Sequence, residues 1–156
     1  MVNIKMTIGI GSDHAGFKLK SLIIDYFDEE GISYVDYGTN STESVDYPDF
    51  IFLVAKAVSK KEVEKGIVIC GSGIGASIVA NKIRGIRAAR CENEYVAKFS
   101  RLHNDANILA LGERVIGHEL ALSIVKVWLE TGFEGGRHQN RLNKINELEN
   151  LFYNNG

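Results

Sequence analysis

The sequence predicts an α/β fold of three layers, in which helices flank a five-stranded parallel sheet and one further helix follows at the C-terminus. Short apolar runs rich in β-branched residues alternate with longer amphipathic segments, which is typical of βαβ units. Each short run ends at glycine or polar residues, as strands do. The chain has 156 residues, 45% hydrophobic and 24% charged, which fits one ordinary globular domain over residues 1–156.

Five runs are nearly continuously apolar, which predicts strands buried on both faces of a parallel sheet. They cover residues 6–10, 33–37, 66–70, 86–90 and 108–111.

Five amphipathic segments predict the helices that cover this sheet. They cover residues 17–30, 48–60, 74–81, 92–103 and 118–131. In the first, Leu19, Ile23 and Phe27 fall on one face, as in a helix packed on a sheet. Pro48, the single proline, suits the first turn of the second. This succession of strands and helices predicts a Rossmann-like topology.

A last helix is predicted over about residues 137–156, because Gly135 and Gly136 interrupt the chain before it. Leu142 and Ile145 begin its apolar side. Such an appended helix either packs on a partner subunit or covers its own sheet, and the spacing of its apolar residues allows both.

Composition excludes several classes of protein. The two cysteines, Cys70 and Cys91, are too few for a disulfide scaffold, and a chain of this length folds without one. No segment reaches the roughly 20 apolar residues of a membrane span, so we expect a cytoplasmic protein with no membrane partner. The formal net charge of −2 predicts no nucleic-acid partner.

Ligands of an open parallel sheet bind beyond the carboxyl ends of its strands, so the segments after the strands are candidate sites. After the first strand, Asp13 and His14 place a carboxylate and an imidazole before a helix N-terminus. Asp13 alone is equally explained as a helix cap, and His14 alone as a solvent-facing side chain.

After the third strand, Gly71, Gly73 and Gly75 predict a loop whose N–H groups bind an anion at a helix N-terminus. Cys70 ends the strand beside these groups, an environment that favours a thiolate. The alternatives are a buried structural cysteine, as we expect for Cys91, and a dinucleotide-binding loop with the loose glycine fingerprint.

Further polar residues stand near the fifth strand and at the last helix. His103 and Asn104 precede that strand, and Arg114 follows it. Arg137 and Arg141 share one helix face, which predicts a phosphate clamp. A polar turn and a solvated helix end are the alternatives. The four histidines show no paired ligand spacing, so no metal site is expected.

Taken together and in order, these motifs resemble ribose-5-phosphate isomerase of the B type and its sugar-phosphate isomerase relatives. The matching segments span about the whole chain: 11–17, 36–39, 46–48, 70–75, 81–82, 85–88, 100–107 and 134–141. The resemblance implies the interconversion of D-ribose 5-phosphate and D-ribulose 5-phosphate through an enediol, in the non-oxidative pentose phosphate pathway, without metal or cofactor.

The resemblance also implies how the proton moves. Cys70 would be the base that transfers it between carbons 1 and 2. Ser72 and the N–H groups of Gly71, Gly73 and Gly75 would stabilise the enediolate, as an oxyanion hole does.

The resemblance assigns ring opening and substrate binding to other residues. His103 with Asp13 would open the sugar ring, Asn104 would orient its hydroxyls, and Tyr47 would line the site. The phosphate would be bound by His14, Arg114, Arg137 and Arg141.

The family's active site lies between two subunits, so the resemblance implies a homodimer or a dimer of dimers with shared sites. Cys70 is typical of the branch with a cysteine base, rather than the branch with a glutamate near position 75. Allose 6-phosphate and galactose 6-phosphate are alternative substrates, although His103 and Asn104 favour the pentose. A dinucleotide-binding module and a redox-sensing thiol protein are alternatives from other classes.

Overall fold

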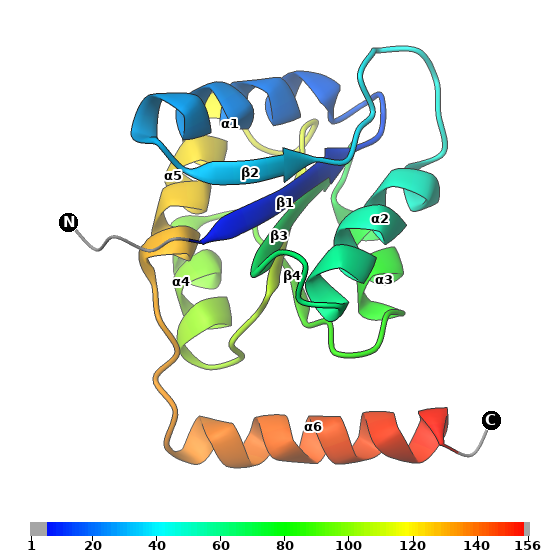
Figure 1. Ribbon diagram of the computed structural model, residues 1–156. Helices are drawn as coiled ribbons and strands as arrows, with labels where there is room; N and C mark the ends of the chain where they lie inside the picture. The colour runs from blue at the N-terminus through cyan, green and yellow to red at the C-terminus, as the bar shows by residue number, and fades with distance from the viewer. Residues whose placement is uncertain (1–5, 155–156) are drawn as a thin grey trace.

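The computed structural model describes residues 6–154 and places five strands in one parallel sheet with the order β2-β1-β3-β5-β4 (Figure 1). The strands are β1 Thr7–Ser12, β2 Ser33–Asp36, β3 Lys65–Cys70, β4 Ala88–Arg90 and β5 Ile108–Gly112. After β1 the chain crosses to β2 on one side, and after β3 it crosses to the far side of β5. The carboxyl ends of β1 and β3 therefore form the crevice where a sheet of this kind binds its ligand.

Six helices accompany the sheet in the described part of the chain. They are α1 Phe17–Glu30, α2 Tyr47–Ser59, α3 Ile74–Asn81, α4 Glu94–Leu102, α5 His118–Glu130 and α6 Arg137–Tyr153. Side chains of α1, α4 and α5 pack on one face of the sheet, and those of α2 and α3 pack on the other (Figure 1). The predicted three-layer α/β fold is confirmed. Within residues 6–154, no helix combines the length and the apolar character needed to cross a membrane.

Local sequence explains where several helices begin and end. Pro48 stands in the first turn of α2, where its missing N–H costs nothing. The Asn93 side chain accepts a hydrogen bond from the N–H of Val96 at 2.9 Å and so caps α4. Gly31 ends α1 in the left-handed conformation with φ 68°, which suits a residue without a Cβ.

Two strand boundaries differ from the prediction because of specific hydrogen bonds. β1 continues through Ser12, whose N–H donates to the Gly38 carbonyl at 2.7 Å. β4 begins only at Ala88, because the N–H of Ile86 donates to Ile83 at 3.1 Å and the N–H of Arg87 donates to the Asn107 side chain at 2.8 Å.

The prediction that all five strands are buried on both faces is wrong for the two edge strands. β2 is mostly exposed, with Val35 at 40% exposure, and β4 is half-buried. The inner strands β1, β3 and β5 are buried almost throughout. An apolar run therefore identifies a strand here, but only the strand's position in the sheet decides its burial.

α6 lies along the edge of the sheet where the strands begin, away from both helical layers (Figure 1). Glu149 on α6 accepts a hydrogen bond from the N–H of Gly85 at 2.9 Å, and the Tyr153 hydroxyl donates to the Lys82 carbonyl at 2.7 Å. Leu148 and Phe152 are 60% and 78% exposed. The alternative in which this helix covers its own sheet is therefore wrong. The last two residues of the predicted helix lie outside the described residues.

Candidate active site

An open cleft of about 540 Å³ lies at the carboxyl ends of β1 and β3. Its lining combines polar groups with apolar side chains. The residues named from the sequence are Asp13, Tyr47, Cys70, Gly71, Ser72, Gly75 and Arg114. The sequence reasoning missed Ile74, Ile78 and Val115, which are about half exposed and form the apolar wall. Their position soon after the ends of β3 and β5 could have predicted these three residues as part of the site.

Cys70 ends β3 at the floor of this cleft. Its Sγ accepts a hydrogen bond from the N–H of Gly73 at 3.2 Å. Gly73 has φ 77°, a left-handed conformation that turns its N–H back toward the sulfur. The side chain of Cys70 is 4% exposed, so the thiol is reached only through the cleft.

The first turn of α3 presents backbone donors beside the sulfur. The N–H of Ile74 donates to Ser72 Oγ at 3.2 Å. No described residue accepts a hydrogen bond from the N–H of Gly75 or Ala76, so these two donors remain for a ligand. Arg90 Nε donates to the Ser72 carbonyl at 2.7 Å and holds the loop against the end of β4.

Asp13 and His14 stand on the other wall, after β1. Asp13 is 6% exposed, and its Oδ1 accepts a hydrogen bond from the N–H of Gly16 at 3.0 Å. The carboxylate thus closes the turn before α1 and lines the cleft, but it does not cap the helix, because Gly16 holds the N-cap position and no side chain caps it. His14 Nδ1 lies 3.1 Å from the backbone nitrogen of Val45 and 3.2 Å from its carbonyl oxygen, so a contact with this residue anchors the ring in either tautomer.

Tyr47 and Arg114 lie close over the glycine loop. A Cβ at Gly75 would come within 2.7 Å of the Tyr47 ring, and one at Gly71 within 3.3 Å of Arg114 Nη1. Both glycines therefore provide space as well as backbone donors. A glutamate at position 75 would displace Tyr47.

Four predicted site residues lie at the opposite edge of the sheet. They are His103, Asn104, Arg137 and Arg141. His103 ends α4 just before β5 begins, and the Asn104 carbonyl accepts a hydrogen bond from Arg87 Nε at 2.9 Å beside the start of β4. Within one chain this segment does not join the others beyond the carboxyl ends, because a loop that leads into a parallel strand lies at its amino end. A strand of six residues separates the two edges by about 17 Å.

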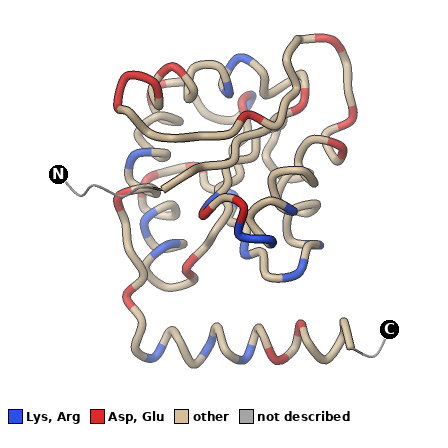
Figure 2. The backbone as a smooth tube through the Cα atoms, viewed as in Figure 1, with Lys and Arg blue, Asp and Glu red and all other residues tan. Residues whose placement is uncertain are grey.

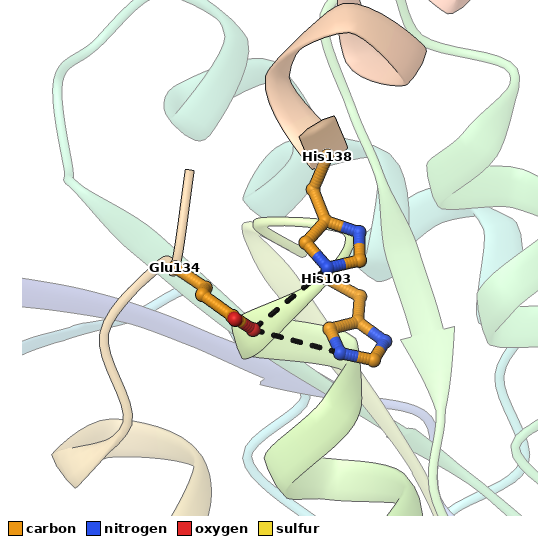
Figure 3. A group of neighbouring side chains, drawn as sticks. All are labelled: His103, Glu134 and His138. Atoms are coloured by element: carbon orange, nitrogen blue, oxygen red, sulfur yellow. Dashed lines mark ion pairs between the residues drawn. The ribbon is translucent and has the colours of Figure 1, made fainter. Parts of the chain in front are cut away.

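His103, Glu134 and His138 converge at this amino edge (Figure 3). Glu134 Oε2 lies 3.7 Å from His103 Nε2 and 3.8 Å from His138 Nε2. The two imidazole rings stack with centroids 4.1 Å apart, and Arg141 Nη1 lies 3.4 Å from His138 Nδ1. No spacing in the sequence predicted this cluster, because packing of α6 against the end of α4 brings the two histidines together.

The charges around His138 alter its proton affinity. Burial lowers the pKa of His138, and the positive charges of His103, Arg137 and Arg141 lower that pKa further, whereas Glu134 raises it. Figure 2 shows that the basic residues of α6 lie in the half of the helix nearest this cluster.

The two cysteines differ sharply in their surroundings, and we expect iodoacetamide to alkylate Cys70 and to spare Cys91 in the folded protein. Cys91 is 1% exposed, and burial raises the pKa of its thiol to about 11, so little thiolate forms at neutral pH. Peptide mass spectrometry after brief labelling measures both sites. Equal labelling of the two cysteines would contradict this expectation.

The chain is similar to known proteins over nearly its full length. Residues 8–145 match the family described as "Ribose/Galactose Isomerase". Ribose-5-phosphate isomerase B of Escherichia coli (strain K12) is 51% identical over 142 residues, which are 91% of this chain and 95% of that protein.

Two solved structures show the same similarity. Ribose-5-phosphate isomerase B of Clostridium thermocellum is 58% identical with a TM-score of 0.93, and the match covers 94% of this chain and 99% of that one. The Mycoplasma genitalium protein of the same name, solved with bound ribulose 5-phosphate, is 40% identical with a TM-score of 0.90, over 94% of this chain and 98% of that one. The matched residues include both the cleft and the amino-edge cluster.

Proposed function

This chain belongs to the ribose/galactose isomerase family, and we propose that it interconverts D-ribose 5-phosphate and D-ribulose 5-phosphate at sites shared between two subunits. The observation that carries this function is the meeting of Cys70, Asp13 and the N-terminus of α3 in one cleft. A thiol base beside backbone donors suits proton abstraction next to a carbonyl group. The family match does not support a dinucleotide-binding module.

The reaction begins with ring opening. Asp13 from one subunit and His103 of the partner subunit act together: one donates a proton to the ring oxygen, and the other takes the proton from the hydroxyl on carbon 1. The bond between carbon 1 and the ring oxygen breaks, and the free aldehyde forms. Asn104 of the partner subunit orients the sugar hydroxyls, and Tyr47 packs along the chain of the sugar.

Proton transfer between the two carbons follows. The Cys70 thiolate removes the proton from carbon 2, the electron pair forms the double bond to carbon 1, and negative charge develops on the carbonyl oxygen. Ser72 and the backbone donors at Gly71, Gly73 and Gly75 line this region, with the N–H of Gly75 unoccupied and that of Gly73 already directed at the sulfur. A proton passes from the hydroxyl on carbon 2 to the oxygen on carbon 1, the thiol returns its proton to carbon 1, and carbon 2 becomes the ketone carbonyl. One carbon is reduced as its neighbour is oxidised, so no cofactor is needed.

Four cationic or donor side chains bind the phosphate group. His14 and Arg114 come from the subunit that supplies Cys70, and Arg137 and Arg141 come from α6 of the partner subunit. Guanidinium groups suit this task because they bind phosphate oxygens in pairs.

A homodimer accounts for the division of the candidate residues between two edges. One chain cannot close a gap of about 17 Å with side chains alone. Exposed apolar residues occur on α6, at Ile145 and Leu148, and beside the cleft, at Ile74 and Ile78, as an interface between two copies requires. A two-fold dimer forms two equivalent sites. We assign the enzyme to the cytoplasm and to the non-oxidative pentose phosphate pathway, since a reducing compartment keeps Cys70 a free thiol.

A direct isomerase assay tests the function. Purified protein is mixed with D-ribose 5-phosphate in the presence of a chelator, and ribulose 5-phosphate is measured by NMR. Parallel reactions with allose 6-phosphate and galactose 6-phosphate test the alternative hexose substrates. Conversion of the pentose at the highest kcat/KM supports the function, and no conversion of the pentose would exclude it.

Subunit complementation tests the shared site. We expect Cys70→Ala and His103→Ala homodimers to be nearly inactive, but a mixture unfolded and refolded together to regain about one quarter of the wild-type activity. Random pairing makes half of the dimers mixed, and each mixed dimer has one site with neither substitution. The control is a mixture of Cys70→Ala with Cys70→Ser, which regains nothing. If the first mixture also stays inactive after refolding into dimers, the two residues act in the same subunit.

A further inference from the structure

The cluster of His103, Glu134 and His138 has the donors of a metal site. Each residue offers one ligand atom, and these atoms all lie within 4.8 Å of one another. They come from the end of α4, the loop before α6 and the first turn of α6. Figure 3 shows both Nε2 atoms directed at the same oxygen of Glu134.

One of the three ligands is buried and lacks a hydrogen bond. His138 is 3% exposed, and its Nε2 finds no hydrogen-bond partner among the described residues. A buried nitrogen without a hydrogen bond destabilises the folded protein unless a ligand binds it. The Glu134 carboxylate, at 3.8 Å from this nitrogen, lies beyond hydrogen-bonding distance.

We propose that His103, Glu134 and His138 bind a divalent transition-metal ion of the zinc class, and that the bound ion inhibits the isomerase. Two imidazoles and one carboxylate suit Zn²⁺, Co²⁺ or Ni²⁺ and do not suit Mg²⁺ or Ca²⁺, which prefer oxygen ligands. Three protein ligands leave a fourth position for water, so the ion is removable by chelators.

The ligand distances require only a local adjustment. Tetrahedral Zn²⁺ with bonds of about 2.0–2.1 Å holds its donors about 3.3 Å apart, slightly closer than the distances of 3.7 Å and 3.8 Å to Glu134. The side chains of His103 and Glu134 are 35% and 58% exposed and can move, whereas His138 is fixed by burial. When the three ligands close around the ion, the His103 ring tilts out of its stack on His138.

Two arginines limit the affinity of this site. Arg141 donates toward His138 Nδ1, and metal binding at Nε2 places the imidazole proton on Nδ1, so this contact must loosen. Arg137 adds a second positive charge beside the cluster. The ion is therefore a reversible ligand and not a structural metal.

The inhibition rests on the proposed function, whereas the binding does not. A metal ion on His103 occupies the nitrogen that opens the sugar ring in the proposed function, and this accounts for the inhibition. Binding and activity are consequently measured separately, so that each can fail without the other.

Binding is measured with Co²⁺ alone, in a Cys70→Ser background in which the cleft thiol takes no metal. We expect the visible absorption bands of tetrahedral cobalt, and a loss of affinity of at least about tenfold in Glu134→Gln and in His138→Gln. The matched control is His118→Gln, because His118 lies on α5 with Glu113 at 4.0 Å and outside the cluster. Absence of the bands, or equal affinity in all four proteins, would overturn the site.

Inhibition is measured with Zn²⁺ on the chain with its natural Cys70. We expect activity to fall with added Zn²⁺, to return with a chelator, and to need at least about tenfold more Zn²⁺ in Glu134→Gln. Equal inhibition of Glu134→Gln would overturn the inhibitory role while leaving the cobalt result intact. If the protein does not isomerise any of the sugar phosphates, the cobalt bands still decide the binding.

Discussion

Replacement of Cys70 by alanine is expected to lower kcat about 10³-fold, within the range that a positioned general base contributes. The substitution removes the only sulfur among the described residues that line the cleft and leaves the N-terminus of α3, Arg114 and Asp13 in place. KM should therefore change little, because the groups that bind the sugar phosphate remain. Steady-state kinetics with D-ribose 5-phosphate measure both quantities.

Cys91→Ala is the matched control, since it removes the other cysteine from the opposite helical layer. We expect it to keep kcat and to lose some stability through the small cavity it leaves. In deuterated water, the Cys70 variant should also stop incorporating solvent deuterium at carbons 1 and 2. Retention of most of the wild-type kcat, or of this exchange, would show that another group carries the proton.

Gly112→Ala is expected to damage both stability and activity. A Cβ at Gly112 would lie 2.5 Å from the carbonyl carbon and oxygen of Ser72. Both partners are backbone, so neither can rotate away, and overpacking of this kind costs about 1–3 kcal/mol of unfolding free energy. The loop that holds Gly73 against Cys70 must move, so we expect kcat to fall at least about tenfold with the loss of that hydrogen bond.

Gly132→Ala is the control for this substitution. Gly132 lies in the loop after α5, and no atom among its non-neighbouring residues lies within 4 Å of a Cβ placed there. The unfolding free energy of the Gly132→Ala variant should equal that of the wild type or exceed it by about 0.4–1 kcal/mol. Thermal unfolding and kinetics on both variants make the comparison. A Gly112→Ala enzyme with unchanged kcat would mean that the glycine loop tolerates displacement.

Sequence periodicity predicted the fold well because strands and helices carry their signals locally. α1 and α3 begin and end at the predicted residues, 17–30 and 74–81. The start of β4 could not be predicted, since the side chain of Asn107 binds the N–H of Arg87 from another element. β2 is exposed because it lies at the edge of the sheet, and the order of the strands has no local signal in the sequence.

The cleft at the carboxyl edge was predictable for the same reason. Asp13 directly follows β1 and Cys70 is the last residue of the neighbouring strand β3, so strand direction alone brings them together. The residues around His103 could not be placed in the cleft in this way, because they lead into β5 rather than follow it. The pairing of His103 with His138 depends on how α6 packs against α4, and no spacing in the sequence encodes that contact.

In the proposed site shared by two subunits, the placement of α6 at the amino edge makes catalysis depend on protein concentration. A chain with the proposed base, Cys70, at one end of the sheet and the proposed phosphate-binding arginines of α6 at the other would hold two incomplete half-sites, however well it folds. Diluting the protein until its dimers dissociate would then abolish turnover without unfolding a single strand. Folding and activity are thus governed by two different equilibria, the first within one chain and the second between two.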